Sequence, residues 1–245
     1  FKQKTAYEIS LGLVGSEMCI RDRDSPMAEG ATPWITEAVV NAQSIHILGA
    51  GLNSARPAHQ AIHDLDGRGW RLVPIHPRDA GSSILGRPIR PSIDEGIIPE
   101  IVVLFLAPER AKQAVTKMLM QYPQDNFPVI WFQIGALDDD TAEMLEESDR
   151  RFVSEDCIVR YITRNDLYPR VKLNSSKWFR QISDEDGSGC SVWQAFSDDI
   201  DLMSTELEWV GDLLDLEQSQ HTIARYIRSL QKNDETLLET AIRLT

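Results

Sequence analysis

Long apolar runs are missing from this 245-residue sequence. The longest of them, at residues 101–107, is much shorter than the roughly 20 consecutive apolar residues that a transmembrane helix needs. We therefore predict a soluble protein that does not associate with membranes.

Cysteine is also scarce, with three residues in the whole chain. Cys19, Cys157 and Cys190 form no CxxC pair, which argues against a disulfide framework and a structural zinc site. A reducing cytoplasm is the location that this pattern favours. His59 and His63 share one face of a predicted helix, but no third ligand stands at a recognisable spacing. We interpret them as a surface pair and predict no metal site.

Basic residues are few compared with acidic ones. The chain has 25 Lys and Arg against 38 Asp and Glu, a formal net charge of -13. Non-specific binding to nucleic acid and docking on anionic membranes both need a basic surface, so this balance argues against both. The net charge does not exclude a local basic pocket that binds a phosphorylated small molecule.

The first 23 residues have little in common with the rest of the chain. Residues 1–23 closely resemble translated sequencing-adapter sequence, and we expect them not to belong to the native protein. A native N-terminal strand or a signal peptide is the alternative. The short apolar run in this segment is broken by glycine, however, and Arg21-Asp22-Arg23 stands where a cleavage site would be. Met27 is then a plausible start.

Residues 24–164 alternate between apolar strands and amphipathic helices. Compact apolar runs predict strands at 44–48, 70–75, 101–106, 129–132 and 152–153. Helical spacing, proline at the first helical position and acidic first turns predict helices at 34–42, 57–65, 108–120 and 140–150. This order predicts an α/β fold, a doubly wound parallel Rossmann-type sheet. His46 falls inside the first strand, where we expect a core or edge side chain with satisfied nitrogens.

The pattern changes beyond residue 164. Residues 168–189 show little apolar periodicity, whereas helical spacing returns at 200–214, 223–230 and 237–242. We expect residues 165–245 to form an irregular segment followed by a helical extension. Its acidic surface is a possible site for a protein partner or for a second copy of the chain.

A glycine turn follows the first predicted strand and precedes a helix. It reads Gly49-Ala50-Gly51-Leu52-Asn53-Ser54-Ala55-Arg56-Pro57. Without a Cβ, glycine lets the backbone approach an anion closely, and the start of a helix directs free N–H groups and a positive dipole end at it. Asn53 and Ser54 can cap the helix or donate to phosphate, and Arg56 can pair with it. Ser54 stands in place of the third glycine of the GxGxxG fingerprint, which argues against a conventional dinucleotide site.

The residues at the end of the second predicted strand indicate which class of nucleotide binds. NAD sites usually place Asp or Glu there to bind the ribose hydroxyls. This chain has His76-Pro77-Arg78. A basic residue at this place favours a phosphorylated ribose, as in NADP or in the 3′-phosphate of coenzyme A, although Arg78 as a solvated loop charge is the alternative.

Residues 45–164 resemble the CoA-binding domain family, the small Rossmann proteins related to the N-terminal domain of the succinyl-CoA ligase α subunit. Six landmarks in order carry the resemblance: Gly49-Ala50 with Arg56-Pro57, His76-Pro77-Arg78, Leu85 to Ser92, Phe105-Leu106-Ala107-Pro108, Trp131 to Gly135, and Asp156-Cys157. In three places the chain departs from the family pattern. Gly51 stands where the family usually has serine, His76 replaces asparagine and Ile134 replaces proline.

The resemblance implies a binding site for coenzyme A or an acyl-CoA. The cofactor-binding residues that it implies, together with the glycine turn, are Gly49, Ala50, Gly51, Asn53, Ser54, Arg56, Pro57, His76, Pro77, Arg78, Phe105, Ala107 and Pro108. The phosphates would lie on the glycine turn, the adenosine end near Arg78, and pantetheine along Phe105 to Pro108. The ligases have their catalytic histidine in another domain, so we expect a binding or regulatory protein without catalytic residues.

Two other interpretations remain open. An NADP-dependent oxidoreductase fits a basic residue after the second strand, but no Tyr/Lys or His/Asp arrangement supplies a proton donor. A scaffold that acts through the acidic helical part at residues 165–245 needs no small ligand.

Overall fold

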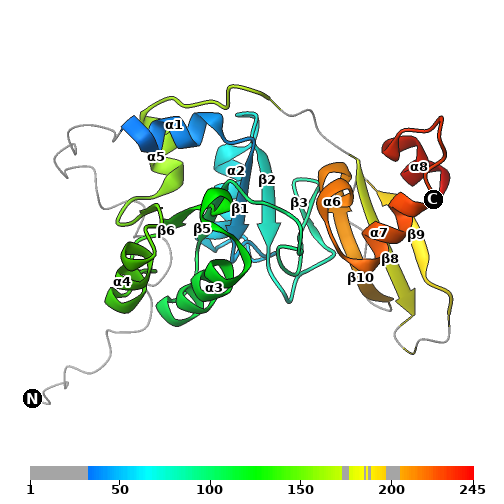
Figure 1. The fold of residues 1–245 in the computed structure, drawn as a ribbon, viewed down its shortest axis with the longest axis horizontal. Coiled ribbons are helices and arrows are strands. Elements are labelled where there is room, and N and C mark those ends of the chain that lie inside the picture. Colours follow the sequence, from blue (N-terminus) through cyan, green and yellow to red (C-terminus); the bar gives the residue numbers. More distant parts are fainter. Residues whose placement is uncertain (1–32, 173–176, 185, 187–188, 197–204) are drawn as a thin grey trace, which may run out of the picture.

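The computed structural model describes residues 33–172, 177–184, 186, 189–196 and 205–245. A parallel sheet with helices on both faces forms the larger part, and a smaller unit with its own antiparallel sheet follows it (Figure 1). No helix of these residues is long and apolar enough to cross a membrane.

The larger sheet has five parallel strands in the order β2-β1-β5-β6-β7. Its strands are β1 (Ser44–Leu48), β2 (Arg71–Ile75), β5 (Ile101–Leu104), β6 (Val129–Phe132) and β7 (Phe152–Val153). The central strands are buried on both faces, which explains their nearly unbroken apolar sequences. The predicted doubly wound α/β sheet is therefore confirmed.

Helices cover the two faces of this sheet, and each face has its own core. The helices are α1 (Pro33–Asn41), α2 (Pro57–Leu65), α3 (Pro108–Gln121), α4 (Asp139–Glu147) and α5 (Ile158–Arg164). Because side chains alternate along a strand, Ile45 and Ile47 pack with α1, α2 and α5, whereas Val102 and Leu104 pack with α3 and α4. The helix α5 was not predicted.

The connection from β2 to β5 contains no helix. Residues 76–100 instead form a hairpin of β3 (Ser83–Ile84) and β4 (Arg87–Pro88), followed by a loop. The second face of the sheet therefore lacks a crossover helix over β1 and β2. His46 and Val73 of these strands face a cavity whose other side includes Val210 and Asp215 of the C-terminal unit.

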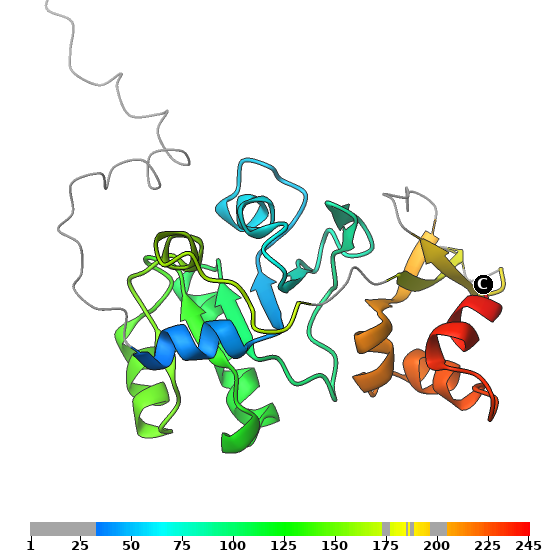
Figure 2. The same cartoon turned by 90° about the horizontal axis from the view of Figure 1, so that it is seen from above.

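The C-terminal unit, shown in yellow to red in Figure 2, contacts β2 through Arg71. It consists of β8 (Trp178–Asp184), β9 (Val192–Phe196), β10 (Thr205–Asp212), α6 (Leu213–Gln218), α7 (Thr222–Ser229) and α8 (Leu237–Arg243). The antiparallel strand order is β10-β8-β9. Phe179, Trp193 and Trp209 stack in its core against the helices, with ring centroids 5.6 Å apart in each neighbouring pair.

Two expectations for this unit are wrong. Residues 205–212, expected to be helical, form the strand β10, and the stretch at 168–189, expected to be irregular, contains β8. A register shift between Leu207 and Trp209 interrupts the two-residue alternation of β10, so its apolar spacing imitates that of a helix. The helices predicted at 223–230 and 237–242 are confirmed as α7 and α8. Residues 200–204 of the first expected helix lie outside the described residues.

Candidate functional site

The candidate site lies where the carboxyl ends of β2, β1 and β5 meet. The Gly49 N–H donates to the Ile75 carbonyl at 2.9 Å, and the Phe105 N–H donates to the Leu48 carbonyl at 3.0 Å. The chain leaves β1 toward β2 on one side and returns to β5 on the other, so the glycine turn stands at a topological switch point. Open α/β sheets bind their ligands at this place.

Gly49 can only be glycine in this backbone. Its φ is +99°, a value that side chains rarely allow. A Cβ at this position would also lie 2.6 Å from the Phe105 carbonyl oxygen. Gly49 therefore lets the turn after β1 pack closely against the segment after β5.

Gly51 leaves room for two side chains of the loop after β2. A Cβ here would collide with the Asp79 carboxylate and lie 2.9 Å from the His76 ring. The loop after β2 thus occupies the space into which a side chain at position 51 would point. A serine at this position would require the Asp79 side chain to move.

Asp79 belongs to this site, although the sequence analysis placed no acidic residue there. Its Oδ2 accepts a hydrogen bond of 2.8 Å from the Leu52 N–H and lies 3.1 Å from His76 Nδ1. Both side chains are partly buried, at 27% and 22% exposure. The sequence signal for Asp79 is an acidic residue four positions after the end of β2, one position beyond the His76-Pro77-Arg78 landmark.

The start of α2 differs from the expected capping arrangement. Arg56 is the N-cap residue, its side chain makes no capping hydrogen bond, and Pro57 occupies the first helical turn. Asn53 Oδ1 accepts from the Ala55 N–H at 3.0 Å, and the Ser54 carbonyl accepts from Gln60 Nε2 at 2.7 Å. Neither Asn53 nor Ser54 therefore caps the helix, and their alternative role, donation to a phosphate, stays a prediction.

Two arginines flank the glycine turn. Arg56 and Arg78 are exposed, and neither guanidinium has a hydrogen-bond or ion-pair partner among the described residues. Pro77, between His76 and Arg78, is exposed as well. The positive charges of Arg56 and Arg78 are therefore not neutralised by another described side chain.

The third segment of the candidate site follows β5. Phe105 is partly buried against the core that lies under α1, α2 and α5. Ala107 is exposed at the N-cap of α3, and Pro108 begins that helix. All thirteen residues named from the sequence therefore lie in three segments at adjacent strand ends: Gly49, Ala50, Gly51, Asn53, Ser54, Arg56, Pro57; His76, Pro77, Arg78; and Phe105, Ala107, Pro108.

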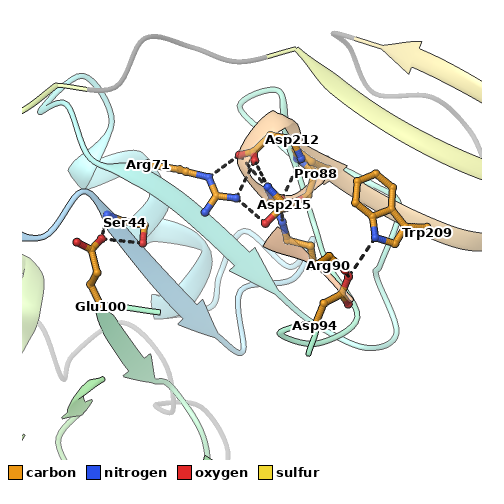
Figure 3. Close-up of polar contacts among 10 residues, drawn as sticks. Ser44, Arg71, Pro88, Arg90, Asp94, Glu100, Trp209, Asp212 and Asp215 are labelled. Atoms are coloured by element: carbon orange, nitrogen blue, oxygen red, sulfur yellow. Dashed lines mark hydrogen bonds and ion pairs between the residues drawn. The ribbon is translucent and has the colours of Figure 1, made fainter. Parts of the chain in front are cut away.

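A second polar cluster, which no sequence pattern predicted, joins the sheet to the C-terminal unit (Figure 3). Arg71 donates from Nε to Asp212 Oδ2 at 2.5 Å and from Nη2 to Asp215 Oδ1 at 2.6 Å. Arg90 donates to Asp215 Oδ2 from Nε at 3.0 Å and from Nη2 at 2.5 Å. Sequence alone offers no sign of this pairing, because more than 120 positions separate the partners.

Electrostatics in this cluster favour the charged forms. Burial by itself raises the pKa of Asp215, but Arg71 and Arg90 outweigh it and hold that pKa well below its usual value. Burial likewise lowers the pKa of Arg71, and Asp215 and Asp212 more than reverse the effect. The cluster is a set of paired buried charges that anchors the C-terminal unit.

His46 lies next to this cluster with 1% exposure. Neither ring nitrogen has a hydrogen-bond partner among the described residues, so the expectation of satisfied nitrogens is wrong. Burial, and next the charge of Arg71, lower the pKa of His46 to about 3. His46 is therefore neutral at physiological pH and lines a cavity of about 10 Å³, roughly the space for one water molecule.

The strand order, the helices on both faces and the glycine turn at the switch point define a Rossmann-like α/β domain. Residues 43–162 match the family model described as the CoA binding domain. This part of the chain belongs to that family.

Several solved structures are similar to this domain. A Thermus thermophilus protein is 24% identical, with a TM-score of 0.49 and coverage of 55% of this chain and 98% of its own. A hypothetical protein from Pyrococcus horikoshii is 23% identical, with a TM-score of 0.48 and coverage of 57% and 95%. A conserved hypothetical protein from Pyrococcus furiosus is 22% identical, with a TM-score of 0.43 and coverage of 49% and 98%. No curated protein sequence matches the chain.

Proposed function

We propose that this protein binds coenzyme A or an acyl-CoA at the carboxyl ends of β1, β2 and β5. The observation that carries the proposal is the position of Arg56 and Arg78. Both flank the glycine turn without a partner among the described residues, in a domain of the CoA-binding family.

We assign each part of coenzyme A to one of the three segments of the candidate site. The phosphates lie on the backbone of residues 49–54 and pair with Arg56, while the 3′-phosphate of the ribose pairs with Arg78. Pantetheine runs along Phe105, Ala107 and Pro108, where the partly buried phenylalanine offers apolar contact.

The proposed role is binding without catalysis. We propose residues 24–164 as the ligand-binding domain of a cytoplasmic protein. Residues 165–245 then form an extension that covers the sheet beside β2 and β1, since Asp212 and Asp215 are buried against Arg71 and Arg90. Part of the acidic surface expected for a partner is thus used within the chain.

Isothermal titration calorimetry of the purified full chain tests the proposal. Coenzyme A is expected to bind, and NADPH at the same concentration to bind at least tenfold more weakly. An Arg56→Ala, Arg78→Ala double variant should weaken coenzyme A binding by roughly tenfold or more, because each charge-assisted hydrogen bond contributes about 1.5–3 kcal/mol.

The matched control removes two exposed positive charges elsewhere, Lys117 on α3 and Arg225 on α7. A Lys117→Ala, Arg225→Ala variant should bind coenzyme A as the wild type does. Equal affinities of the two double variants, or binding of NADPH alone, would contradict the proposed function.

A further inference from the structure

The carboxylate of Asp79 occupies the glycine turn. Asp79 Oδ2 accepts from the Leu52 N–H at 2.8 Å, and the absence of a side chain on Gly51 makes room for this contact. In glycine turns that bind phosphate, backbone N–H groups of this kind face the anion. One anion, supplied by the protein itself, is therefore already bound.

The side chain of Asp79 can leave this position without moving the loop. The loop is held by backbone hydrogen bonds, from the Asp79 N–H to the His76 carbonyl and from the Ser82 N–H to the Asp79 carbonyl, both at 3.2 Å. The His76 N–H also donates to the Arg90 carbonyl at 3.0 Å. Rotation of the Asp79 side chain breaks its contacts with Leu52 and His76 and none of these backbone bonds.

A phosphate and the Asp79 carboxylate cannot share the Leu52 N–H. Two negative charges a few ångströms apart in a partly buried site repel each other by several times the thermal energy, and solvent screens only part of it. The nearest ionisable partner of the carboxylate is His76, on the same loop.

We propose that Asp79 determines the affinity of this site by occupying the phosphate position of the glycine turn until a phosphorylated ligand displaces it. This inference rests on the proposed function, because it concerns the same turn. It makes Asp79 an internal competitor of the ligand phosphate. Only ligands that carry phosphate are affected, since the competition is for an N–H that binds an anion.

An Asp79→Asn variant tests the inference. Asparagine keeps the size and the acceptor oxygen of the side chain, so the loop is retained, but the negative charge is lost. We expect the full-length variant to bind coenzyme A roughly tenfold more tightly than the wild type, and pantetheine, which has no phosphate, with unchanged affinity.

Asp166→Asn is the matched control. Asp166 is a surface residue beside Arg68, which precedes the amino end of β2, and its positive φ of 47° suits asparagine. This variant loses the same charge, and its affinity for coenzyme A should change less than about twofold.

The outcomes separate the two proposals. If the wild type binds coenzyme A and Asp79→Asn binds it equally or more weakly, the inference is wrong and the proposed function stands. Weaker binding would mean that Asp79 contacts the ligand, as a carboxylate does when it accepts from a ribose hydroxyl. An equal gain for pantetheine also overturns the inference, and absence of coenzyme A binding in both proteins overturns both proposals.

Discussion

Arg90 donates two hydrogen bonds to a single carboxylate oxygen of Asp215, and both side chains are buried. The backbone of Arg90 is bonded to Pro74 and His76 at the end of β2, so this residue connects the candidate site to the C-terminal unit. The two parts of the molecule are thereby joined through a charged contact shielded from water.

Asp215→Asn should destabilise the protein strongly. The substitution leaves Arg71 and Arg90 buried with less compensating charge, a situation that costs about 3–5 kcal/mol. Urea denaturation gives the free energy of unfolding. The control is Asp140→Asn, which breaks an exposed ion pair with Lys112 and should cost less than about 1 kcal/mol. Similar losses in both variants would show that the buried cluster does not anchor the C-terminal unit.

Stability should decrease as the pH falls below 6.5, because His46 is buried in its neutral form. Its pKa is about 3 in the folded protein and 6.5 in the unfolded chain, so acid protonates the unfolded chain first. One pH unit corresponds to about 1.36 kcal/mol, and the contribution lost between pH 7.5 and pH 5 is about 2 kcal/mol.

The measurement is urea denaturation at these two pH values. His46→Leu should lose less stability on acidification than the wild type does, by about the same 2 kcal/mol. His63→Gln, which removes an exposed histidine, should behave like the wild type. An unchanged pH dependence in His46→Leu would rule out the buried neutral histidine as its cause.

Gly49→Ala should cost more stability than Gly67→Ala. Both glycines have positive φ, +99° and +74°, so alanine costs backbone energy of about 1–2 kcal/mol at either position. A Cβ at Gly49 also meets the Phe105 carbonyl, whereas nothing lies within 4 Å of a Cβ at Gly67. Overpacking adds about 1–3 kcal/mol, and denaturant unfolding of the two variants measures the difference. Equal losses would mean that the turn after β1 does not pack tightly against the segment after β5.

Gly51→Ala should be tolerated better when Asp79 is also shortened. In the wild type the new Cβ collides with the Asp79 carboxylate, and in an Asp79→Ala background that collision is absent. Contacting residues typically show coupling energies of about 0.5–3 kcal/mol in double-mutant cycles. The free energies of unfolding of the wild type, the two single variants and the double variant complete the cycle. Additive effects would mean that the Asp79 side chain does not contact the glycine turn.

Much of the α/β domain was predictable because its signals are local. Strand β1 and helix α2 have the predicted bounds, since an apolar run followed by glycine and a proline at a helix start act within a few residues. The C-terminal strands were not predictable in the same way. Pairing of β8 with β9 and β10 is non-local, and the irregularity in β10 disguised its two-residue period.

Within the candidate site, the sequence by itself determined the glycine turn and the arginine-bearing segments beside it, because strand order and turn chemistry follow from short patterns. Only the tertiary structure decided what lies between these segments. Asp79 folds back onto Leu52, and Arg71 and Arg90 find their carboxylates more than 120 residues away. These contacts form in three dimensions between side chains whose positions along the chain carry no common period, so only the folded chain defines them.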